Sequence, residues 1–568
     1  MILLPQPKKL NITEGFLKSK SVAIKNLCSD SRIEKALRFF STGGDVSLTV
    51  DCKDLESEGY VLSINENEIT IKGDSAAGAF YAIQTLKQIF EYEKVPCLYI
   101  EDAPDMKHRG FYHDVTRGKV PTVDRLKKLI DSIAYYKMNS LQIYVEHTFP
   151  FKELGDLIEK TGYLSPDEIR ELDDYCYDNF IEFIPSIATF GHLYELLQRE
   201  EYKELQCLED YKEDCVFWAC RMAHHTIDPK NEKSIKLIQS LIDQYIPLFR
   251  TDKFNICCDE TFDLKSGKHK DEDTGKLYID FVKLIVSYLK SKGKKIMMWG
   301  DILLEHPETI SELPKDIEFL NWAYYADPKE TQFKVLAELG CKQIVCPGTN
   351  SWSRLVENVE VADKNITAVL EHGYKFDAEG MLNTNWGDYG NPCSIEMAMR
   401  GLILGAAKSW NRATNADETF DKGINLLEYK NENAVKYLVM LDKAHSYVEW
   451  NNFAWIYSNL KWGEKYTVKY PIEKELAETV SLCQNVINSL TKQKWERDEY
   501  RLEFLLAAEG ITVIAELYAK LAGYGIVRVS DTNHWLSAYR KEWLKYNKES
   551  ELSEIENMFV FLEGFVNK

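Results

Sequence analysis

The chain lacks the segments that mark membrane and exported proteins. No apolar run in its 568 residues reaches the ~18 residues that a membrane-spanning helix needs. The N-terminal stretch MILLPQPKKLNITEGF has only a short apolar patch, a proline at position 5 and no small-residue cleavage site. This is not the pattern of a signal peptide. We therefore expect a soluble cytoplasmic protein with no membrane partner, unless an export signal has been trimmed from the chain.

Positively charged residues are also fewer than negatively charged ones. The 70 Lys and Arg residues stand against 90 Asp and Glu residues, which gives a formal net charge of −20. The sequence has no block of about five or six basic residues and no stripe that mixes aromatic and basic side chains. This composition disfavours nonspecific binding to nucleic acid or to anionic membranes. We expect no nucleic-acid partner.

Metal and redox motifs are absent too, although cysteine is not. Of the thirteen cysteines, Cys215 and Cys220 are five positions apart, and Cys257 and Cys258 are adjacent. Neither spacing is that of a zinc ribbon or of a redox C-x-x-C motif. We interpret the cysteines as buried or surface thiols in a reducing compartment.

Length and patterning indicate several domains. The chain is too long for one core, and its composition, 45% hydrophobic and 28% charged, is that of a globular protein. Residues 1–104 resemble a small α/β domain with a sheet and helices. GYVLSINENEITIKG has the pattern of two strands around a tight polar turn, and SAAGAFYAIQTLKQIFEY places apolar residues at helical spacing.

From Arg109 onward, strand-like and helix-like segments alternate. Helix-like segments such as VDRLKKLIDSIAYYK lie between most of the strand-like runs, which are RGFYHD, SLQIYV, IEFIPS, KFNICC, KIMMW, IEFLNW, KQIVC and GMLNTNW. This alternation predicts a (β/α)8 TIM barrel over residues 105–424. A doubly wound open sheet is the alternative. It is weakened because no G-x-G-x-x-G motif follows the first strand.

After about Asn425 the strand signals stop. Residues 425–568 hold long helical segments rich in Trp, Tyr and Phe, such as NAVKYLVMLDKAHSYVEWNNFAWIYSNLKW. We expect an α-helical C-terminal domain packed on the barrel, with these aromatic side chains in its core. Its helices could form a homodimer interface, although nothing in the sequence requires one.

One pair of adjacent acids stands out. The run KFNICC suits a buried strand and is followed at once by Asp259 and Glu260. Five Asp-Glu dipeptides occur in the chain, and the other four lie in polar, helix-like or loop surroundings. Only Asp259-Glu260 closes a strand-like run, so this pair is the candidate for chemistry.

Other polar and aromatic residues collect at the predicted strand ends, where the chemistry of such barrels lies. They are Asp114, Glu146, His147, His192, Trp299, Trp322, Tyr324, Asn350, Trp352, Trp386 and Asp388, and the first strand also supplies Arg109 near its start. Indole rings stack on the apolar faces of a pyranose, and charged side chains pair with its hydroxyls, so the set predicts a sugar pocket. Asp114, Glu146 and His147 could equally be structural hydrogen-bonding groups.

Several motifs resemble glycoside hydrolase family 20, the β-N-acetylhexosaminidases. HRGFYHDVTRGKVPTVDRLKKLIDSIAYYKMNSLQIYV resembles its first barrel segment, and IEFIPSIATFGH resembles a strand that ends in Pro-Gly-His. TIDPKNEKS is similar to the Asp-Pro segment that follows, and FNICCDE to the catalytic strand, which usually ends in Gly-Gly-Asp-Glu. NWGDYG resembles the Trp and acidic residue that close the pocket, and GYVLSINENEITIKGDSAAGAFYAIQTL the small domain before the barrel. The match covers roughly residues 55–412.

The chain also departs from this family in ways that indicate a divergent, bacterial-type branch. Cys257 and Cys258 replace the usual glycines, and Asn255 stands where His is common. Thr and Phe precede Gly191-His192 where the family often has Met-Pro. The tyrosine that holds the acetamido oxygen is not obvious; the candidates are Tyr324, Tyr325 and Asn350.

The resemblance implies an exo-acting retaining β-N-acetylhexosaminidase for terminal β-linked GlcNAc, GalNAc or both. In this family the 2-acetamido oxygen of the substrate attacks its own anomeric carbon and forms an oxazolinium ion, so neither metal nor cofactor is needed. Glu260 would be the general acid/base, and Asp259 would orient and stabilise the acetamido group. We expect the charge of Asp259 to keep Glu260 protonated near neutral pH.

The resemblance also assigns the substrate-binding residues. Arg109 and Asp388 would bind sugar hydroxyls, and His192 would support the site through hydrogen bonds. The aromatic wall would comprise Trp299, Trp322 and Trp386. The set is completed by Glu146, Tyr324, Asn350 and Trp352.

Two other interpretations stay open. One is another glycosidase on the same barrel, either a two-carboxylate retaining enzyme, which would not require a 2-acetamido group, or a member of the O-GlcNAc-removing families. Those families typically carry an Asp-Asp pair, and Glu260 argues against them. The other interpretation is a sugar-binding protein without catalysis, which the intact Asp259-Glu260 pair disfavours.

Overall fold

Alternating apolar residues build the N-terminal part of the chain into a mixed six-stranded sheet backed by two helices. The computed structural model describes residues 1–208, 214–526 and 528–568. The strands lie in the order β1-β6-β4-β5-β3-β2. The elements are β1 (Lys9–Phe16), β2 (Val22–Asn26), α1 (Ser31–Leu37), β3 (Val46–Cys52), β4 (Tyr60–Ile64), β5 (Glu68–Gly73), α2 (Ala76–Phe90) and β6 (Pro96–Asp102).

The predicted hairpin and helix of this unit are confirmed as β4, β5 and α2. Leu62 and Ile71 are paired across the hairpin and fully buried, because alternate residues of a strand face the same side. The Ser75 side chain caps α2 by accepting a hydrogen bond from the Gly78 amide. The remaining strands and α1 were not assigned from the sequence, because strands such as β1 expose most of their residues.

The interpretation of the cysteines as thiols is wrong at two places. Cys28 is joined to Cys52 and Cys215 to Cys220, with Cα atoms 5.4 Å and 6.1 Å apart. The sequence did not reveal these pairs, because pairing depends on Cα separation, which spacing alone does not show. The other nine cysteines are free, and eight of them are buried.

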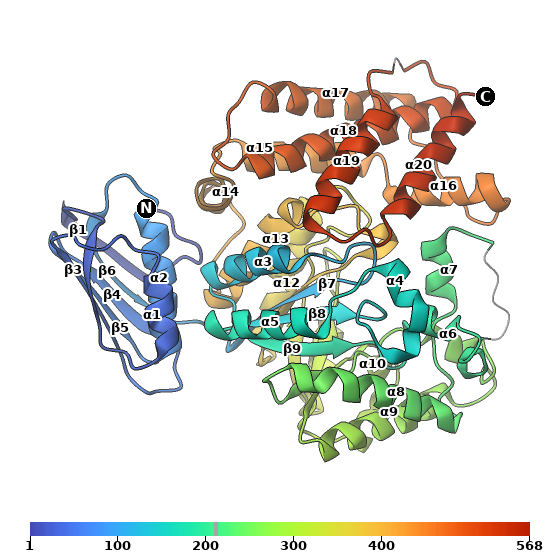
Figure 1. Ribbon diagram of the computed structural model, residues 1–568, viewed down its shortest axis with the longest axis horizontal. Helices are drawn as coiled ribbons and strands as arrows, with labels where there is room; N and C mark the ends of the chain where they lie inside the picture. The colour runs from blue at the N-terminus through green and yellow to red at the C-terminus, as the bar shows by residue number, and fades with distance from the viewer. Residues whose placement is uncertain (209–213, 527) are drawn as a thin grey trace.

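Eight parallel strands close into a barrel in the order β10-β11-β12-β13-β14-β7-β8-β9 (Figure 1). This confirms the (β/α)8 barrel and excludes the doubly wound open sheet. The strands are β7 (His108–Asp114), β8 (Ser140–Val145), β9 (Glu182–Ile187), β10 (Lys253–Asn255), β11 (Lys295–Trp299), β12 (Glu318–Trp322), β13 (Lys342–Cys346) and β14 (Gly380–Asn385).

The fourth barrel strand is shorter than predicted. β10 ends at Asn255, and it meets β9 through a single aligned pair, Asn255 with Ser186. The backbone leaves the strand because Cys257, Cys258 and Glu260 have φ angles of +56°, +64° and +49°. These left-handed conformations are unusual for residues with a side chain and cannot continue a pleated strand. Asp259 and Glu260 therefore lie on a turn at the rim of the barrel.

Helices surround the barrel, and the amphipathic segments predicted from the sequence form them. In α3, for example, Leu126, Ile130 and Ile133 face inward and are buried. The helices of this part are α3 (Val123–Tyr135), α4 (Ile158–Thr161), α5 (Pro166–Asp178), α6 (Tyr194–Leu197), α7 (Phe217–Ala223), α8 (Glu232–Tyr245), α9 (Thr274–Ser291), α10 (Asp301–Glu305), α11 (Glu330–Glu338), α12 (Val359–Lys375) and α13 (Met399–Trp410).

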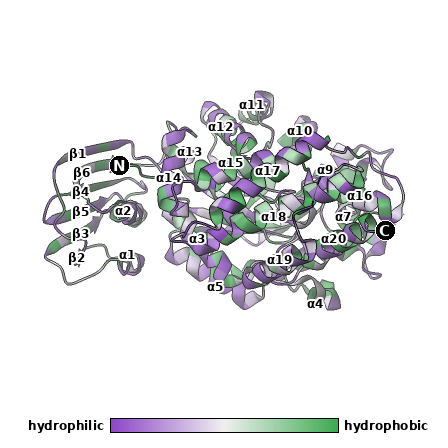
Figure 2. Cartoon of the chain, turned by 90° about the horizontal axis from the view of Figure 1, so that it is seen from above, coloured by the Kyte–Doolittle hydropathy of each residue, from purple (hydrophilic) through white to green (hydrophobic). Residues whose placement is uncertain are grey.

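The last part of the chain is helical and lies over the barrel, as Figure 2 shows from above. Its aromatic side chains form a core, as expected: Trp535 and Phe559 have ring centroids 4.8 Å apart, and both are buried. The helices are α14 (Glu418–Ile424), α15 (Ala434–Ser446), α16 (Trp450–Trp462), α17 (Glu473–Leu490), α18 (Asp498–Leu521), α19 (Thr532–Tyr546) and α20 (Leu552–Val566). Among the described residues, we find no helix with the length and apolarity needed to cross a bilayer.

Candidate active site

A cavity of about 260 Å³ opens where the barrel strands end. Nine of the residues predicted from the sequence line it: His192, Asp259, Glu260, Trp299, Trp322, Tyr324, Trp352, Trp386 and Asp388. Eight further residues line it that the sequence interpretation had not assigned to the site: Arg117, Tyr144, Trp218, Arg221, Met222, Ser353, Tyr389 and Asn451. The cavity thus combines carboxylates, arginines and a large aromatic surface.

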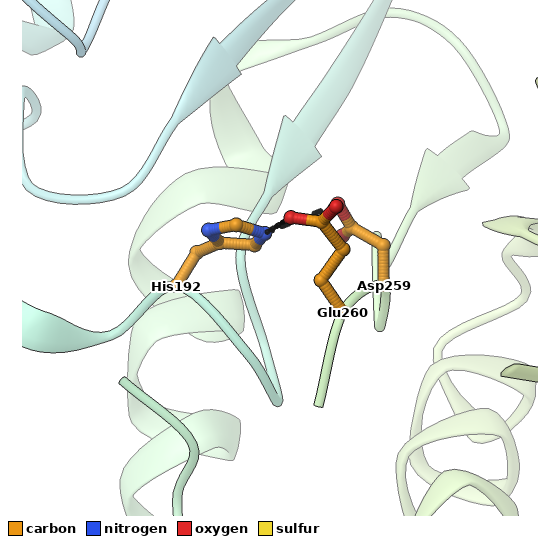
Figure 3. A group of neighbouring side chains, drawn as sticks. All are labelled: His192, Asp259 and Glu260. Atoms are coloured by element: carbon orange, nitrogen blue, oxygen red, sulfur yellow. Dashed lines mark ion pairs between the residues drawn. The ribbon is translucent and has the colours of Figure 1, made fainter. Parts of the chain in front are cut away.

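The two adjacent acids meet at one histidine. Figure 3 shows the His192 ring pointing at both carboxylates; its Nε2 lies 3.3 Å from Asp259 Oδ2 and 3.4 Å from Glu260 Oε2. Asp259 is buried, and its Oδ1 has no hydrogen-bond partner among the described residues. The Glu260 side chain is 28% exposed, so it is the more accessible of the two acids.

The charge of this histidine overturns one expectation about protonation. Burial alone would lower the pKa of His192, but Asp259 and Glu260 outweigh it and raise that pKa well above its ordinary value. Burial would likewise raise the pKa of Glu260, yet the hydrogen bond and the charge of His192 leave it lowered. The pKa of Glu260 is therefore shifted in the direction opposite to the one expected from the charge of Asp259, because His192 Nε2 lies within 3.4 Å of both acids.

His192 is held from behind by backbone and ring contacts. Its φ is +60°, its amide donates to His225 Nδ1 at 2.9 Å, and the two imidazole rings stack with centroids 4.8 Å apart. The His225 amide in turn donates to Asp263 Oδ2 at 2.9 Å. This support fixes the direction in which the His192 ring points. His192, Asp259 and Glu260 also form a group whose possible metal-ligand atoms lie within 4.8 Å of one another.

A third acid, which the sequence interpretation missed, lies beside the pair. Asp301 Oδ2 accepts the Glu260 amide at 3.0 Å, and its Oδ1 is buried without a hydrogen-bond partner among the described residues. Burial, followed by the charge of Asp259, raises the pKa of Asp301 to about 7. Because this hydrogen bond holds a residue with a positive φ, Asp301 stabilises the turn that presents Glu260.

An aromatic wall faces the acids. Trp299 and Trp386 have ring centroids 5.6 Å apart, and the Trp386 indole N–H donates to the Tyr324 hydroxyl at 2.7 Å. Trp322 stacks on Tyr324 with centroids 5.0 Å apart, and Trp352 packs edge-on against Tyr324 at 5.1 Å. Tyr324 therefore contacts Trp322, Trp352 and Trp386 of the wall.

An arginine and two aspartates form a polar edge beside the aromatic wall, and the Arg117 guanidinium lies 4.9 Å from the centroid of the Trp386 ring. Arg117 Nε donates to Asp114 Oδ2 at 2.7 Å, and its guanidinium forms an ion pair with Asp388. Asp114 also accepts the Gly387 amide at 3.0 Å, so it joins the loops after β7 and β14. Arg117 and Asp388 both line the cavity, whereas Asp114 is completely buried beneath them.

The assignment of Arg109 to the sugar is wrong. Arg109 lies near the start of β7, at the end of the barrel away from the cavity, and is completely buried. It donates to Glu58 of the N-terminal unit at 2.7 Å and to the carbonyls of Met106 and Lys137. Its hydrogen bonds therefore tie the barrel to the N-terminal unit, and Arg117 is the arginine that β7 supplies to the cavity.

Four other predicted positions lie outside the cavity lining: Glu146, His147, Asn350 and Tyr325. Glu146 is buried behind His192, where its Oε1 accepts from the Tyr144 hydroxyl at 3.0 Å. Burial would raise the pKa of Glu146, but the nearby His147, Arg221 and His192 lower it to about 2. The Asn350 amide donates to the Gly348 carbonyl. Tyr325 is 75% exposed, which leaves Tyr324 as the cavity tyrosine among the candidates named.

The residues that the sequence interpretation missed differ in how visible they were. Arg117 and Tyr389 follow predicted strand ends within a few residues, so they could have been found there. Asp301 stands in a Trp-Gly-Asp tripeptide after β11 that repeats the one containing Asp388 after β14. Trp218, Arg221 and Met222 lie on α7, and Asn451 lies on α16. No motif marks these last four.

Family models match most of the chain. Residues 106–424 match the model described as glycosyl hydrolase family 20, catalytic domain, and residues 6–103 match glycosyl hydrolase family 20, domain 2. The catalytic match alone spans more than half of the chain. Residues after 424 lie outside both matches.

Curated proteins of similar sequence carry related names. The chain is 27% identical over 286 residues to a beta-hexosaminidase of Porphyromonas gingivalis, an alignment that covers 44% of this chain and 36% of that protein. It is 26% identical over 224 residues to hexosaminidase D of Homo sapiens, which covers 37% of this chain and 44% of that protein. The chain spans less than half the length of these two relatives.

Solved structures share the fold. A chitobiase of Flavobacterium johnsoniae is 19% identical with a TM-score of 0.61, over 98% of this chain and 99% of that chain. An exo beta-N-acetylglucosaminidase of Vibrio harveyi, in complex with N-acetylglucosamine, is 18% identical with a TM-score of 0.59 over 75% of this chain and 77% of that chain.

Proposed function

Because the chain belongs to glycosyl hydrolase family 20, we propose that it is an exo-acting retaining β-N-acetylhexosaminidase. It would remove terminal β-linked GlcNAc, GalNAc or both from an oligosaccharide or other glycoside. The observation that carries this proposal is the adjacent pair of Asp259 and Glu260, presented with His192 at the rim of the barrel and facing a wall of four tryptophans.

The reaction we propose uses the substrate as its own nucleophile. The 2-acetamido oxygen attacks the anomeric carbon while the bond to the leaving oxygen breaks, and an oxazolinium ion forms. An internal nucleophile replaces much of the entropy cost of a bimolecular encounter. No second carboxylate has to reach the anomeric carbon, so two neighbouring acids suffice although they project from one turn.

Asp259 is the group we assign to the acetamido. Its buried Oδ1, which has no hydrogen-bond partner among the described residues, would accept the acetamido N–H. As positive charge develops on the oxazolinium, an ionised carboxylate already in place stabilises it without reorganisation. Tyr324, whose hydroxyl accepts from Trp386, is the donor we assign to the acetamido oxygen.

Glu260 is the acid/base we propose. It would protonate the leaving oxygen and later take a proton from the attacking water. The pKa of Glu260 is lowered by His192 in the protein without substrate. A bound sugar covers the exposed part of its side chain and excludes water, which favours the neutral acid needed for the first step.

Specificity would come from the remaining lining. We assign Arg117 and Asp388, which form an ion pair in the cavity lining, to sugar hydroxyls, and the indole faces to stacking on the sugar ring. A cavity of about 260 Å³ would hold one terminal sugar, which fits exo cleavage.

Hydrolysis of an aryl β-N-acetylglucosaminide beside the matching aryl β-glucoside, without added metal, tests this function. Cleavage of the acetamido substrate alone is the expected result, because only that substrate carries the internal nucleophile. The matching GalNAc substrate completes the set. Equal cleavage of the glucoside would contradict the mechanism and favour an ordinary two-carboxylate glycosidase, and sugar binding without turnover of any of the three would indicate a binding protein.

A further inference from the structure

A short helix of the cavity wall is anchored by one residue of the C-terminal helices. α7 brings Trp218 and Arg221 to the cavity, and both side chains donate to Glu551, which directly precedes α20. The Trp218 indole N–H reaches Oε2 at 2.9 Å. Arg221 donates to Oε1 at 2.5 Å and to Oε2 at 3.3 Å. One carboxylate thus fixes two side chains of the wall.

Glu551 also connects α7 with two loops that carry polar lining residues. Its amide donates to the Gly118 carbonyl at 3.2 Å, next to Arg117. The Trp218 ring that it holds packs against Gly390, where an added Cβ would come within 2.4 Å of the indole. Gly390 ends the segment that begins at Asp388. The loops after β7, β9 and β14 therefore meet around this residue.

The contact is buried and charged, which makes it specific. Trp218 and Arg221 are 2% and 4% exposed, and the Glu551 side chain is 11% exposed. Removal of Glu551 would take from the buried Arg221 the carboxylate that it is hydrogen-bonded to, which is costly although Glu146 and Glu195 also act on its charge. A bidentate carboxylate also fixes the orientation of a planar guanidinium.

A second residue of the C-terminal helices lines the cavity directly. Asn451 stands in the first turn of α16, and its side-chain oxygen is buried without a hydrogen-bond partner among the described residues. Buried polar atoms in folded proteins nearly always have a partner. An oxygen in this position is suited to accept a hydrogen bond from a sugar hydroxyl.

We propose that the helices after residue 424 complete the substrate pocket, with Glu551 as the positioning residue for Trp218 and Arg221 and Asn451 as a further substrate-binding residue. This inference rests on the proposed function. It assigns a role in sugar binding to a part of the chain that lies outside the matched family models. As a consequence, Glu551 and Asn451 of the C-terminal helices affect KM and sugar affinity more than they affect kcat.

The first test compares Glu551→Gln and Glu551→Ala with Glu549→Gln in the full chain. Glu549 is a matched control because it stands two positions away and pairs with Arg540 on the surface, where ion pairs contribute little. The affinity for N-acetylglucosamine is measured by tryptophan fluorescence, together with KM and kcat for the aryl substrate. Loss of hydrogen bonds to a charged group costs about 10- to 100-fold, so we expect Glu551→Ala to weaken affinity and raise KM at least about tenfold. Glu549→Gln should match the wild type.

Two further variants separate a positioning role from a merely structural one. In a Trp218→Phe background the indole donor is gone, so Glu551→Gln should reduce affinity less than it does in the wild type. Asn451→Ala should weaken N-acetylglucosamine binding several-fold, since it removes about one hydrogen bond, with an unchanged melting temperature. This variant tests the proposal even if the Glu551 variants do not fold.

The outcomes distinguish a failure of this inference from a failure of the proposed function. One outcome would overturn the inference and leave the function standing. In that outcome the wild type binds and cleaves the acetamido substrate, and the folded Glu551 and Asn451 variants keep its KM and affinity within about twofold. The inference also fails, with the function intact, if Glu551→Ala only lowers the melting temperature. A wild type that neither binds N-acetylglucosamine nor cleaves the aryl substrate would overturn both.

Discussion

Two arginines at opposite ends of strand β7 have opposite roles. Arg109, near its start, is completely buried and pairs with Glu58 of the N-terminal unit. Arg117, three residues past its end, pairs with Asp114 and Asp388 and lines the cavity. The residue type and the strand are the same, and only the end of the barrel differs. One end joins domains, and the other lines the candidate active site.

The contrast shows that a resemblance to a family motif can assign the wrong residue when the position of that residue along the strand is not considered. The resemblance placed Arg109 in the sugar site because it stands in the quoted first barrel segment. In the structure its Nε and Nη1 donate to the Lys137 and Met106 carbonyls, at 2.9 Å and 2.8 Å. A guanidinium held in this way at the far end cannot turn to the cavity. We expect substitution of Arg109 to lower stability alone, and substitution of Arg117, whose pair with Asp114 is also buried, to lower activity as well.

Glu260→Gln should give the greatest loss of activity. General acid–base catalysis contributes about 10²–10⁴-fold, and an amide can neither donate the proton nor receive it. We expect the full loss on substrates with poor leaving groups and a smaller loss on activated aryl glycosides, measured as kcat/KM. Equal losses on both substrate classes would contradict the acid role.

Asp259→Asn should follow, although no covalent bond to Asp259 forms. The amide keeps the shape of the side chain but removes the charge that stabilises the oxazolinium, and one such contribution is worth about 10²–10³-fold in kcat. The measurement is kcat on the aryl N-acetylglucosaminide, with circular dichroism as the check on folding. Near-normal rates in a folded variant would rule out substrate-assisted catalysis here.

The paired variants Arg117→Met and Arg109→Met compare the two ends of β7 directly. Loss of the charged hydrogen bonds of Arg117 should lower kcat/KM about 10–100-fold. Arg109→Met should leave kcat/KM within about twofold but lower the free energy of unfolding by about 3–5 kcal/mol, because it breaks a buried pair. Denaturant unfolding and steady-state kinetics give the two readouts. The contrast fails if Arg109→Met reduces activity in a protein of undiminished stability.

Asp301→Asn should change the pH dependence of stability more than activity at neutral pH. The pKa of Asp301 is raised to about 7 in the folded protein, by burial first and then by the charge of Asp259. In the unfolded chain an aspartate ionises at about 4. The folded state therefore holds its proton more tightly, and stability falls as pH rises from about 4 to 7.

The asparagine side chain can still accept the Glu260 amide but does not titrate. Unfolding of Asp301→Asn should therefore lose less free energy over this pH range than the wild type does. Asp327→Asn, at an exposed position, is the control and should keep the wild-type slope. Parallel slopes for all three proteins would show that Asp301 titrates normally.

Much of the fold could be predicted because its signals are local. Each barrel strand is a short apolar run, and helices such as α3 repeat apolar residues at helical spacing, so alternation along the chain was enough to predict the barrel. The end of β10 was not visible, because Cys257 and Cys258 suit a strand by composition and only their positive φ angles end it. Three of the six N-terminal strands and α1 also lie before the first recognised hairpin and carry weak patterns.

The site was predictable where it lies on the ends of strands. Trp386 and Asp388 were found in one Trp-Gly-Asp tripeptide, and the same tripeptide before α10 could have led to Asp301. Residues that reach the cavity from elements other than the barrel strands carry no recognisable sequence pattern. Asn451 stands on a helix of the C-terminal part, and its place in the cavity depends on how two distant parts of the chain pack, which no local pattern records.

The thin seam between β9 and β10 has a consequence for motion. β8 and β9 are aligned along their length, from Ser140 with Glu182 to Val145 with Ile187, whereas β9 and β10 share the single pair of Ser186 and Asn255. Local openings follow the places where few backbone bonds must break. We expect amide hydrogen exchange to be faster along this seam than along β8. The turn that carries Asp259 and Glu260 would then sit on the part of the barrel that fluctuates most, and could adjust as Glu260 changes from acid to base.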